Sequence, residues 1–191
     1  MQQVQSTRRI PCNHAATRPT TQTMIRIFID ADACPVRDET YQVAERHGLK
    51  TYVVSNRLLA APASPQIERI VVTDGMDVAD DWIAEHVKAH DIVISSDIPL
   101  AARCVAKKAC VLNPNGRILD ENAIGMALAM RNLMEDLRST GTMLGGGKSF
   151  TKKDRSAFLS ALDTAVVRGK KQAAGSVLAA RLAAPPGGRS V

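Results

Sequence analysis

The stretch that decides the fold is Ile25-Arg26-Ile27-Phe28-Ile29-Asp30-Ala31-Asp32-Ala33-Cys34-Pro35. Its apolar run has little polar alternation, which is typical of a central strand in a parallel sheet. The run ends in Asp30 and Asp32, and Pro35 suits the first turn of a following helix. Open α/β sheets bind ligands at the carboxyl ends of their strands. Because an unpaired carboxylate is costly to bury, the pair indicates a bound cation, a shared proton or an open cleft there.

Further apolar runs predict the rest of the sheet. Four more strands are expected, at residues 50–55, 70–72, 92–95 and 109–112. Helices are expected over 36–47, 77–88 and 99–108, each between two of these strands. Strands that alternate with helices are typical of a parallel sheet covered on both faces. The expected fold class is therefore α/β, a three-layer parallel sheet of about five strands followed by C-terminal helices.

Only helices are expected after the turn at Asn113-Pro114-Asn115-Gly116. A helix that begins near Asp120 carries an apolar stripe, and the spacing of that stripe predicts one buried face. Its members are Met126, Met130, Leu133 and Leu137. A last helix, running to about residue 170 or beyond, would turn three apolar side chains inward, namely Phe158, Leu162 and Val166.

The charge of the chain is unevenly distributed. A length of 191 residues fits one domain, and the net charge is +6. Residues 1–23 hold three arginines and residues 168–191 hold five basic residues, with no acid in either segment. The 17 basic and 19 acidic residues that remain give the part between them a charge of −2. We expect a disordered extension over 1–23, a domain over 24–172 and a flexible basic tail over 173–191.

Composition narrows the class of protein. The four cysteines have no CxxC spacing, and nothing resembles a secretory signal. No apolar run approaches the ~20 residues of a membrane span. We therefore expect a reduced, cytoplasmic protein with no membrane contact. An aromatic content of 3% argues against a base-stacking platform for single strands.

Aspartates gather after three of the predicted strands. They are Asp30, Asp32, Asp74, Asp77, Asp80, Asp81 and Asp97. Parallel strands end at one edge, so we expect these side chains on one side of the sheet. Asp74, Asp77 and Asp81 also suit helix caps or first-turn positions, whereas Asp30 and Asp97 are expected to have no helix of their own to stabilise. Their mutual repulsion indicates a cation, and hard oxygen donors suit Mg²⁺ or Mn²⁺ rather than zinc.

Several motifs occur in a specific order. They are Ile29-Asp30-Ala31-Asp32-Ala33-Cys34-Pro35, Gly75-Met76-Asp77-Val78-Ala79-Asp80, Ser96-Asp97-Ile98-Pro99-Leu100-Ala101, Asn113-Pro114-x-Gly116, Met130-Arg131-x-x-Met134-x-x-Leu137-Arg138 and Lys153-Asp154-Arg155-x-x-Phe158. With these motifs the chain resembles the YaiI/YqxD family of uncharacterised bacterial proteins over about residues 24–166. The resemblance implies a PIN-like, Rossmann-like fold related to metal-dependent ribonucleases.

The clustered acids, of which the resemblance implies all but Asp32, form the predicted set of catalytic residues. They are Asp30, Asp32, Asp77, Asp80, Asp81 and Asp97. Asp30, Asp77 and Asp97 are expected to hold Mg²⁺ or Mn²⁺. A second ion or an oriented water is expected at Asp32, Asp80 or Asp81, with Asp80 and Asp81 as alternatives. Two departures from the family pattern stand out: Asp80-Asp81 replaces the usual Asp-Asn, and Gly146-Gly147-Lys148 replaces a Gly-Gly-Pro loop.

The expected function is that of a metal-dependent nuclease, with RNA favoured over DNA, that hydrolyses phosphodiester bonds with activated water. Polar residues expected to contact the nucleic acid are Asn56, Arg103, Asn113, Arg131, Lys148 and Lys153. The asparagines equally suit turn caps, and the arginines equally suit surface ion pairs.

Two other functions stay open. A haloacid-dehalogenase-like phosphatase would use Asp30 and Asp32 as nucleophile and acid, but the expected Thr after the pair is absent. A non-catalytic module would hold RNA with the basic ends of the chain. Cys34 is unsuited to be a nucleophile, because the acids before it raise its pKa. The oligomeric state is left open by the sequence.

Overall fold

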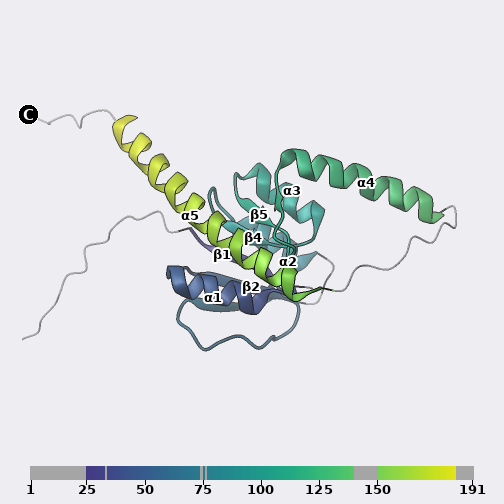
Figure 1. Ribbon diagram of the computed structural model, residues 1–191, viewed down its shortest axis with the longest axis horizontal. Coiled ribbons are helices and arrows are strands. Elements are labelled where there is room, and N and C mark those ends of the chain that lie inside the picture. Colours follow the sequence, from purple (N-terminus) through teal and green to yellow (C-terminus); the bar gives the residue numbers. More distant parts are fainter. Residues whose placement is uncertain (1–24, 33, 74, 76, 140–149, 184–191) are drawn as a thin grey trace, which may run out of the picture.

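The computed structural model describes residues 25–32, 34–73, 75, 77–139 and 150–183 (Figure 1). In chain order the elements are β1 (Ile27–Asp30), α1 (Arg37–His47), β2 (Thr51–Ser55), β3 (Ile67–Val71), α2 (Val78–His86), β4 (Ile92–Ile94), α3 (Ile98–Ala106), β5 (Cys110–Leu112), β6 (Ile118–Leu119), α4 (Glu121–Ser139) and α5 (Lys152–Ala183). The extension predicted over 1–23, together with Asp74 and Lys148, lies outside the described residues.

The strands form one sheet in the order β3-β2-β1-β4-β5-β6. All neighbours are parallel except β5 and β6, so the predicted α/β fold is confirmed. The sixth strand, β6, was not predicted, because the turn before it was expected to lead straight into a helix. Gly116 makes that turn with φ +84°, and a Cβ there would come within 3.1 Å of the Ala157 backbone. Glycine therefore lets the hairpin pass close to α5.

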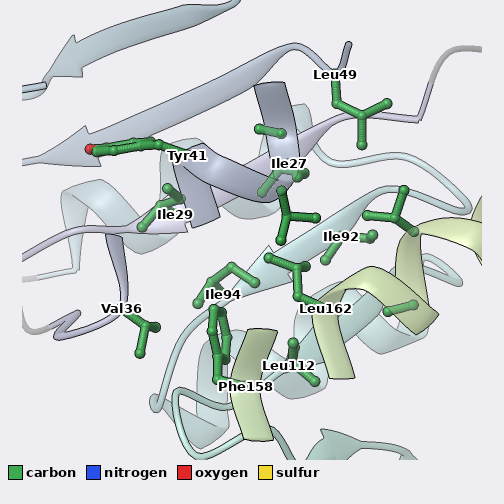
Figure 2. Close-up of a cluster of buried hydrophobic side chains, with 14 of the residues drawn as sticks. Ile27, Ile29, Val36, Tyr41, Leu49, Ile92, Ile94, Leu112, Phe158 and Leu162 are labelled. Carbon is green, nitrogen blue, oxygen red and sulfur yellow. The ribbon is translucent and has the colours of Figure 1, made fainter. Parts of the chain in front are cut away.

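Helices cover both faces of the sheet, which gives the three predicted layers (Figure 1). On one face, Ile27 and Ile29 of β1 pack with side chains of α1 and α5, as Figure 2 shows. On the other face, Phe28 packs with side chains of α2, α3 and the start of α4. The central strand is thus buried from both sides, as its unbroken apolar run predicted.

The two C-terminal helices differ in how well they were predicted. Phe158, Leu162 and Val166 of α5 are fully buried, which confirms that prediction. The buried stripe predicted for α4 is wrong, since Met126, Met130 and Leu133 are 71%, 53% and 51% exposed.

The difference between the helices arises from where each lies on the sheet. Only the start of α4, with Ile124, packs against the domain, and the helix then runs away from the sheet (Figure 1). The side chain of Leu137 is not among those described. Helix α5 continues to Ala183, into the segment expected to be a flexible tail, and Ala173 within it is buried. No helix of the described residues is both long and apolar enough to cross a membrane.

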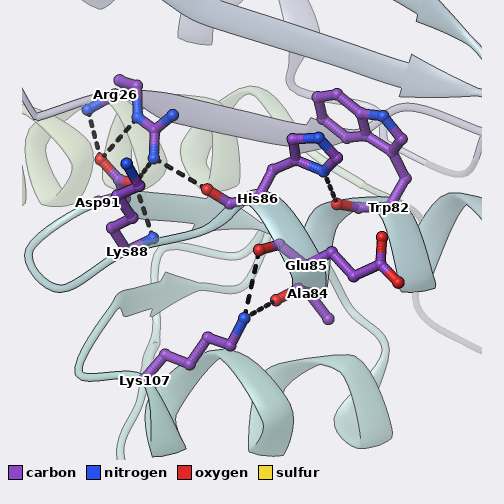
Figure 3. A network of polar contacts seen from close by, with 8 residues as sticks. All are labelled: Arg26, Trp82, Ala84, Glu85, His86, Lys88, Asp91 and Lys107. Atoms are coloured by element: carbon purple, nitrogen blue, oxygen red, sulfur yellow. Dashed lines mark hydrogen bonds and ion pairs between the residues drawn. The ribbon is translucent and has the colours of Figure 1, made fainter.

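A polar network closes the amino edge of the sheet (Figure 3). Asp91 is only 3% exposed and accepts hydrogen bonds from the Arg26 backbone, the Arg26 guanidinium and the Lys88 backbone. Arg26 also donates to the His86 carbonyl oxygen, and Lys107 donates to the last carbonyl oxygens of α2. The carboxyl end of α2 is therefore fixed to β1 and α3, which sets the position of its other end.

Candidate functional site

A pocket of about 350 Å³ opens at the carboxyl edge of the sheet. It is lined by Asp30, Asp32, Asn56, Asp77, Ala79, Asp80, Ser96 and Asp97. It lies beyond the ends of β1 and β4, the two neighbouring strands at which the strand order reverses. Such a topological switch point is the usual ligand site of open α/β sheets. The structure therefore brings together five of the six aspartates that were predicted to be catalytic.

One wall of the pocket is built on Ser95, the residue that follows β4. Ser95 Oγ donates a hydrogen bond to Asp30 Oδ2 at 2.9 Å and accepts one from the Asp97 backbone N–H at 2.9 Å. Ser95 thereby holds the two strand-end acids in fixed positions. This role of Ser95 was not predicted, although a serine directly after a buried apolar strand is a usable signal.

Asp97 has a second role that was not expected. Its Oδ1 accepts a hydrogen bond from the Leu100 backbone at 2.7 Å, which makes it the N-cap of α3. The prediction that Asp97 has no helix to stabilise is therefore wrong. Asp77, which was weighed as a cap, occupies the N-cap position of α2 but makes no side-chain capping bond. Its backbone is left-handed, with φ 64°, and its side chain lines the pocket instead.

The opposite wall is formed by Asp32 and Asn56. The backbone N–H of Asn56 donates to Asp32 Oδ2 at 3.0 Å, so the end of β2 anchors the acid that follows β1. The side-chain oxygen of Asn56 is buried and has no hydrogen-bond partner among the described residues. The pocket therefore contains one buried acceptor that the described chain leaves unsatisfied.

Asp80 and Asp81 separate at the start of α2. Asp80 lines the pocket, whereas Asp81 does not and pairs instead with Arg103 at 2.8 Å. Both partners of that ion pair are about half exposed. Of the two neighbouring acids that were predicted as alternatives, the geometry favours Asp80.

Burial, together with the crowding of carboxylates, raises the pKa values of two of the aspartates. Burial is the largest cause of the raised pKa of Asp30, and the charges of Asp32 and Asp97 add to it, while the bond from Ser95 opposes it. Burial, followed by the charges of Asp30, Asp97 and Asp77, raises the pKa of Asp80 to about 6. A nearby cation would relieve this repulsion.

The model of a family described as "Uncharacterized BCR, YaiI/YqxD family" matches residues 28–168. The chain belongs to the YaiI/YqxD family. A UPF0178 protein of Gluconacetobacter diazotrophicus is 80% identical over 151 residues, which are 79% of this chain and 98% of the relative. A UPF0178 protein of Rhodopseudomonas palustris strain BisB18 is 59% identical over 143 residues, 75% of this chain and 92% of the relative. No solved structure matches the chain significantly.

The resemblance read from the sequence motifs is thus confirmed. The matched range of this YaiI/YqxD family member contains every side chain that lines the pocket. A further similar protein, the UPF0178 protein of Gluconobacter oxydans, is 56% identical over 149 residues, which cover 78% of this chain and 85% of the relative.

The oxygen atoms that the pocket offers are of the chemical types that bind a hard cation. They are carboxylate oxygens and one amide oxygen, the ligands that Mg²⁺ and Mn²⁺ prefer. No three His, Cys, Asp or Glu side chains of the described residues lie close enough together to form a ready-made metal site. Mg²⁺ keeps several waters and usually takes only one or two carboxylates directly. The spacing in this YaiI/YqxD protein therefore fits a hydrated ion better than one enclosed by protein ligands.

The residues predicted to bind substrate are dispersed. Asn56 lines the pocket, and Arg103 lies near enough to lower the pKa of Asp80. Asn113 does not line it, and its Oδ1 accepts a hydrogen bond from the Asn115 backbone at 3.1 Å, so it caps a turn. Lys153 is exposed in the first turn of α5. The side chain of Arg131 and the whole of Lys148 lie outside the described part of the chain.

Cys34 is close to the acids but is not suited to chemistry. It is buried, and burial raises the pKa of its thiol to about 11. Because the thiolate is the nucleophilic form, Cys34 is unreactive near neutral pH. Its side chain packs in the core instead, as the sequence predicted.

Proposed function

We propose that this protein is a metal-dependent nuclease of the PIN-like type, which hydrolyses phosphodiester bonds with RNA favoured over DNA. One observation carries the proposal: five aspartates from three separate segments line one pocket at the switch point of the sheet. No Lys, Arg or His is among the described residues that line it. Nothing basic within that lining offsets the acids, so a cation from solution is the natural partner.

The aspartates divide the work of the site. A bound Mg²⁺ or Mn²⁺ supplies Lewis acidity to the phosphate and lowers the pKa of water. Asp30 and Asp97, which Ser95 fixes, would hold the ion or its waters, and Asp77 at the start of α2 would assist them. Asp80 lines the same pocket, where its carboxylate would accept a proton from the attacking water.

Basic residues outside the pocket would bind the phosphate backbone. Arg103 is near Asp80, and a guanidinium can bind a phosphate through two parallel hydrogen bonds. Lys153 is exposed in the first turn of α5, where the N–H groups of the helix also favour negative charge. These contacts carry no base readout, so we propose cleavage with little sequence preference. The choice of RNA rests on the resemblance to metal-dependent ribonucleases.

The test is cleavage of a fluorescent single-stranded RNA and its DNA counterpart, with Mn²⁺, with Mg²⁺ and with EDTA. We expect cleavage with either ion, faster for RNA, and none with EDTA. Asp30→Asn should reduce the rate at least about 100-fold, the scale of general acid–base and electrostatic contributions. Asp38→Asn is the matched control, because Asp38 is an exposed acid in the first turn of α1, outside the pocket.

Assays on the same protein distinguish a nuclease from the two alternative functions. Equal cleavage by the wild type and Asp30→Asn would refute the nuclease proposal. Release of phosphate from a generic phosphate ester, together with trapping by beryllofluoride, would indicate a phosphatase that uses Asp30 and Asp32. RNA binding that survives EDTA without any cleavage would indicate a non-catalytic RNA-binding module.

A further inference from the structure

Asn56 has a side chain without a structural task. It follows the last residue of β2, and its Oδ1 is buried with no hydrogen-bond partner among the described residues. Buried polar atoms in proteins nearly always have a partner, so an exception requires an explanation. Asn56 lines the acidic pocket, so this free acceptor belongs to a side chain of the candidate site.

An asparagine at the end of a strand often closes the following turn, but after β2 the neighbouring Ser55 does so. Asn113, at the end of β5, shows that task, since its Oδ1 accepts the Asn115 N–H and closes a turn. After β2 the corresponding turn is closed by Ser55, whose Oγ donates to the Arg57 carbonyl oxygen at 2.7 Å. The side chain of Asn56 is therefore not needed for the turn.

The surroundings of Asn56 determine what its oxygen can bind. The other polar side chains that line the pocket are five aspartates and Ser96. Ionised carboxylates only accept hydrogen bonds, so they cannot donate to an amide oxygen, and the Ser96 hydroxyl, which could donate, makes no bond to Asn56 Oδ1. A group that attracts both carboxylate and amide oxygens is a hard cation, or a water held by one.

We propose that Asn56 is a metal-binding residue, whose Oδ1 contacts a divalent cation, directly or through one of its waters, beside Asp32. This inference rests on the proposed function, because the ion is the one proposed there. The backbone of Asn56 already holds Asp32 through the bond to Oδ2, so one residue both orients a charged ligand and supplies a neutral one. The ion would lie between the wall formed by Asp32 and Asn56 and the wall formed by Asp30, Ser95 and Asp97.

The test is Mn²⁺ binding without substrate, measured by titration calorimetry and by the loss of the free Mn²⁺ signal in electron paramagnetic resonance. Asn56→Leu should weaken binding about 10-fold or more, the usual effect of removing a group that supports a metal site. Asn113→Leu is the matched control and should bind Mn²⁺ as the wild type does. Asn56→Asp restores an oxygen at the same position and should bind Mn²⁺ at least as tightly as the wild type.

The outcomes separate this inference from the proposed function. If the wild type does not bind Mn²⁺, both fail. If the wild type and Asn56→Leu bind equally, only the role of Asn56 is refuted. Thermal unfolding in EDTA shows whether each variant folds. Should Asn56→Leu not fold, Asn56→Asp decides: a folded Asn56→Asp protein that binds Mn²⁺ more weakly than the wild type overturns the inference.

Discussion

Ser95 Oγ donates a hydrogen bond to Asp30 Oδ2 at 2.9 Å, and this bond joins the ends of two neighbouring central strands. Ser95 is only 2% exposed, and its oxygen also accepts the backbone N–H of Asp97. A single hydroxyl group therefore sets the distance between two acids of the pocket, and several predictions about the site depend on it.

Ser95→Ala should loosen the pocket and destabilise the fold slightly. The change removes the donor of Asp30 and the acceptor of the Asp97 backbone, so we expect a loss of about 1–2 kcal/mol in the free energy of unfolding. Mn²⁺ binding should also weaken, since the pKa of Asp30 rises without its donor. Urea unfolding and calorimetry measure the two effects. Unchanged Mn²⁺ binding in a stably folded variant would contradict this role.

Two substitutions of Asp97 should separate its contribution to stability from its contribution to nuclease activity. Asparagine caps helices about as well as aspartate, whereas alanine costs about 0.5–2 kcal/mol at an N-cap. Asp97→Asn should therefore keep the stability of the wild type and lose nuclease activity, while Asp97→Ala should lose both. Thermal unfolding and the RNA cleavage assay provide the comparison. If Asp97→Asn remains fully active, Asp97 serves only as a cap.

Asp80 should make the stability of the metal-free protein depend on pH. The fold raises the pKa of Asp80 from 3.8 to about 6, so folding favours the protonated carboxyl. The stability that this proton gives is fully present below about pH 4 and is lost as the pH rises through about 6.

Asp80→Asn should consequently raise the melting temperature in EDTA at pH 7 and have little effect at pH 4. The control Asp38→Asn should show no such difference, because Asp38 is exposed and outside the pocket. Equal effects of Asp80→Asn at both pH values would show that Asp80 is not crowded by the other acids.

Asp91 should be the most costly acid to remove. Its carboxylate is buried and paired with Arg26 at 2.6 Å, so Asp91→Ala leaves a partly buried guanidinium unpaired and should cost about 3–5 kcal/mol. Asp163→Ala should cost much less, because Asp163 pairs with Arg46 and His47 at the surface. Urea unfolding of both variants tests the contrast, and similar losses would contradict it.

The strands and their acids could be predicted because periodicity and strand ends are local features of the sequence. The apolar run at Ile25–Ile29 and the aspartates after three strands required no knowledge of distant contacts. Asn56 was expected to contact substrate, but the hydrogen bonds of Ser95 and Asn56 were not predicted, since they join neighbouring strands that are distant in the sequence.

The two wrong predictions, for Asp97 and for α4, have different origins. Asp97 lies two residues before Pro99, which is a signal for the start of a helix. Because Asp97 also follows a strand, it was predicted to be a metal ligand and not a helix cap. The stripe of α4 has the spacing of a buried face, yet spacing cannot show whether a sheet lies beneath the helix. In the structure, Ile124 and Leu128 of α4 pack on the domain. The exposed Met126 lies between them, and the exposed Met130 and Leu133 lie further along the helix.

The anchoring bonds of the acids bear on which ion suits the pocket. Asp30 and Asp32 each commit Oδ2 to a donor of the protein, and Asp97 commits Oδ1. Each carboxylate thus offers one uncommitted oxygen, which favours attachment through a single atom. Calcium commonly takes both oxygens of a carboxylate in a large, flexible shell, whereas magnesium requires a small octahedron. The hydrogen bonds that fix these side chains would thereby discriminate against the larger ion.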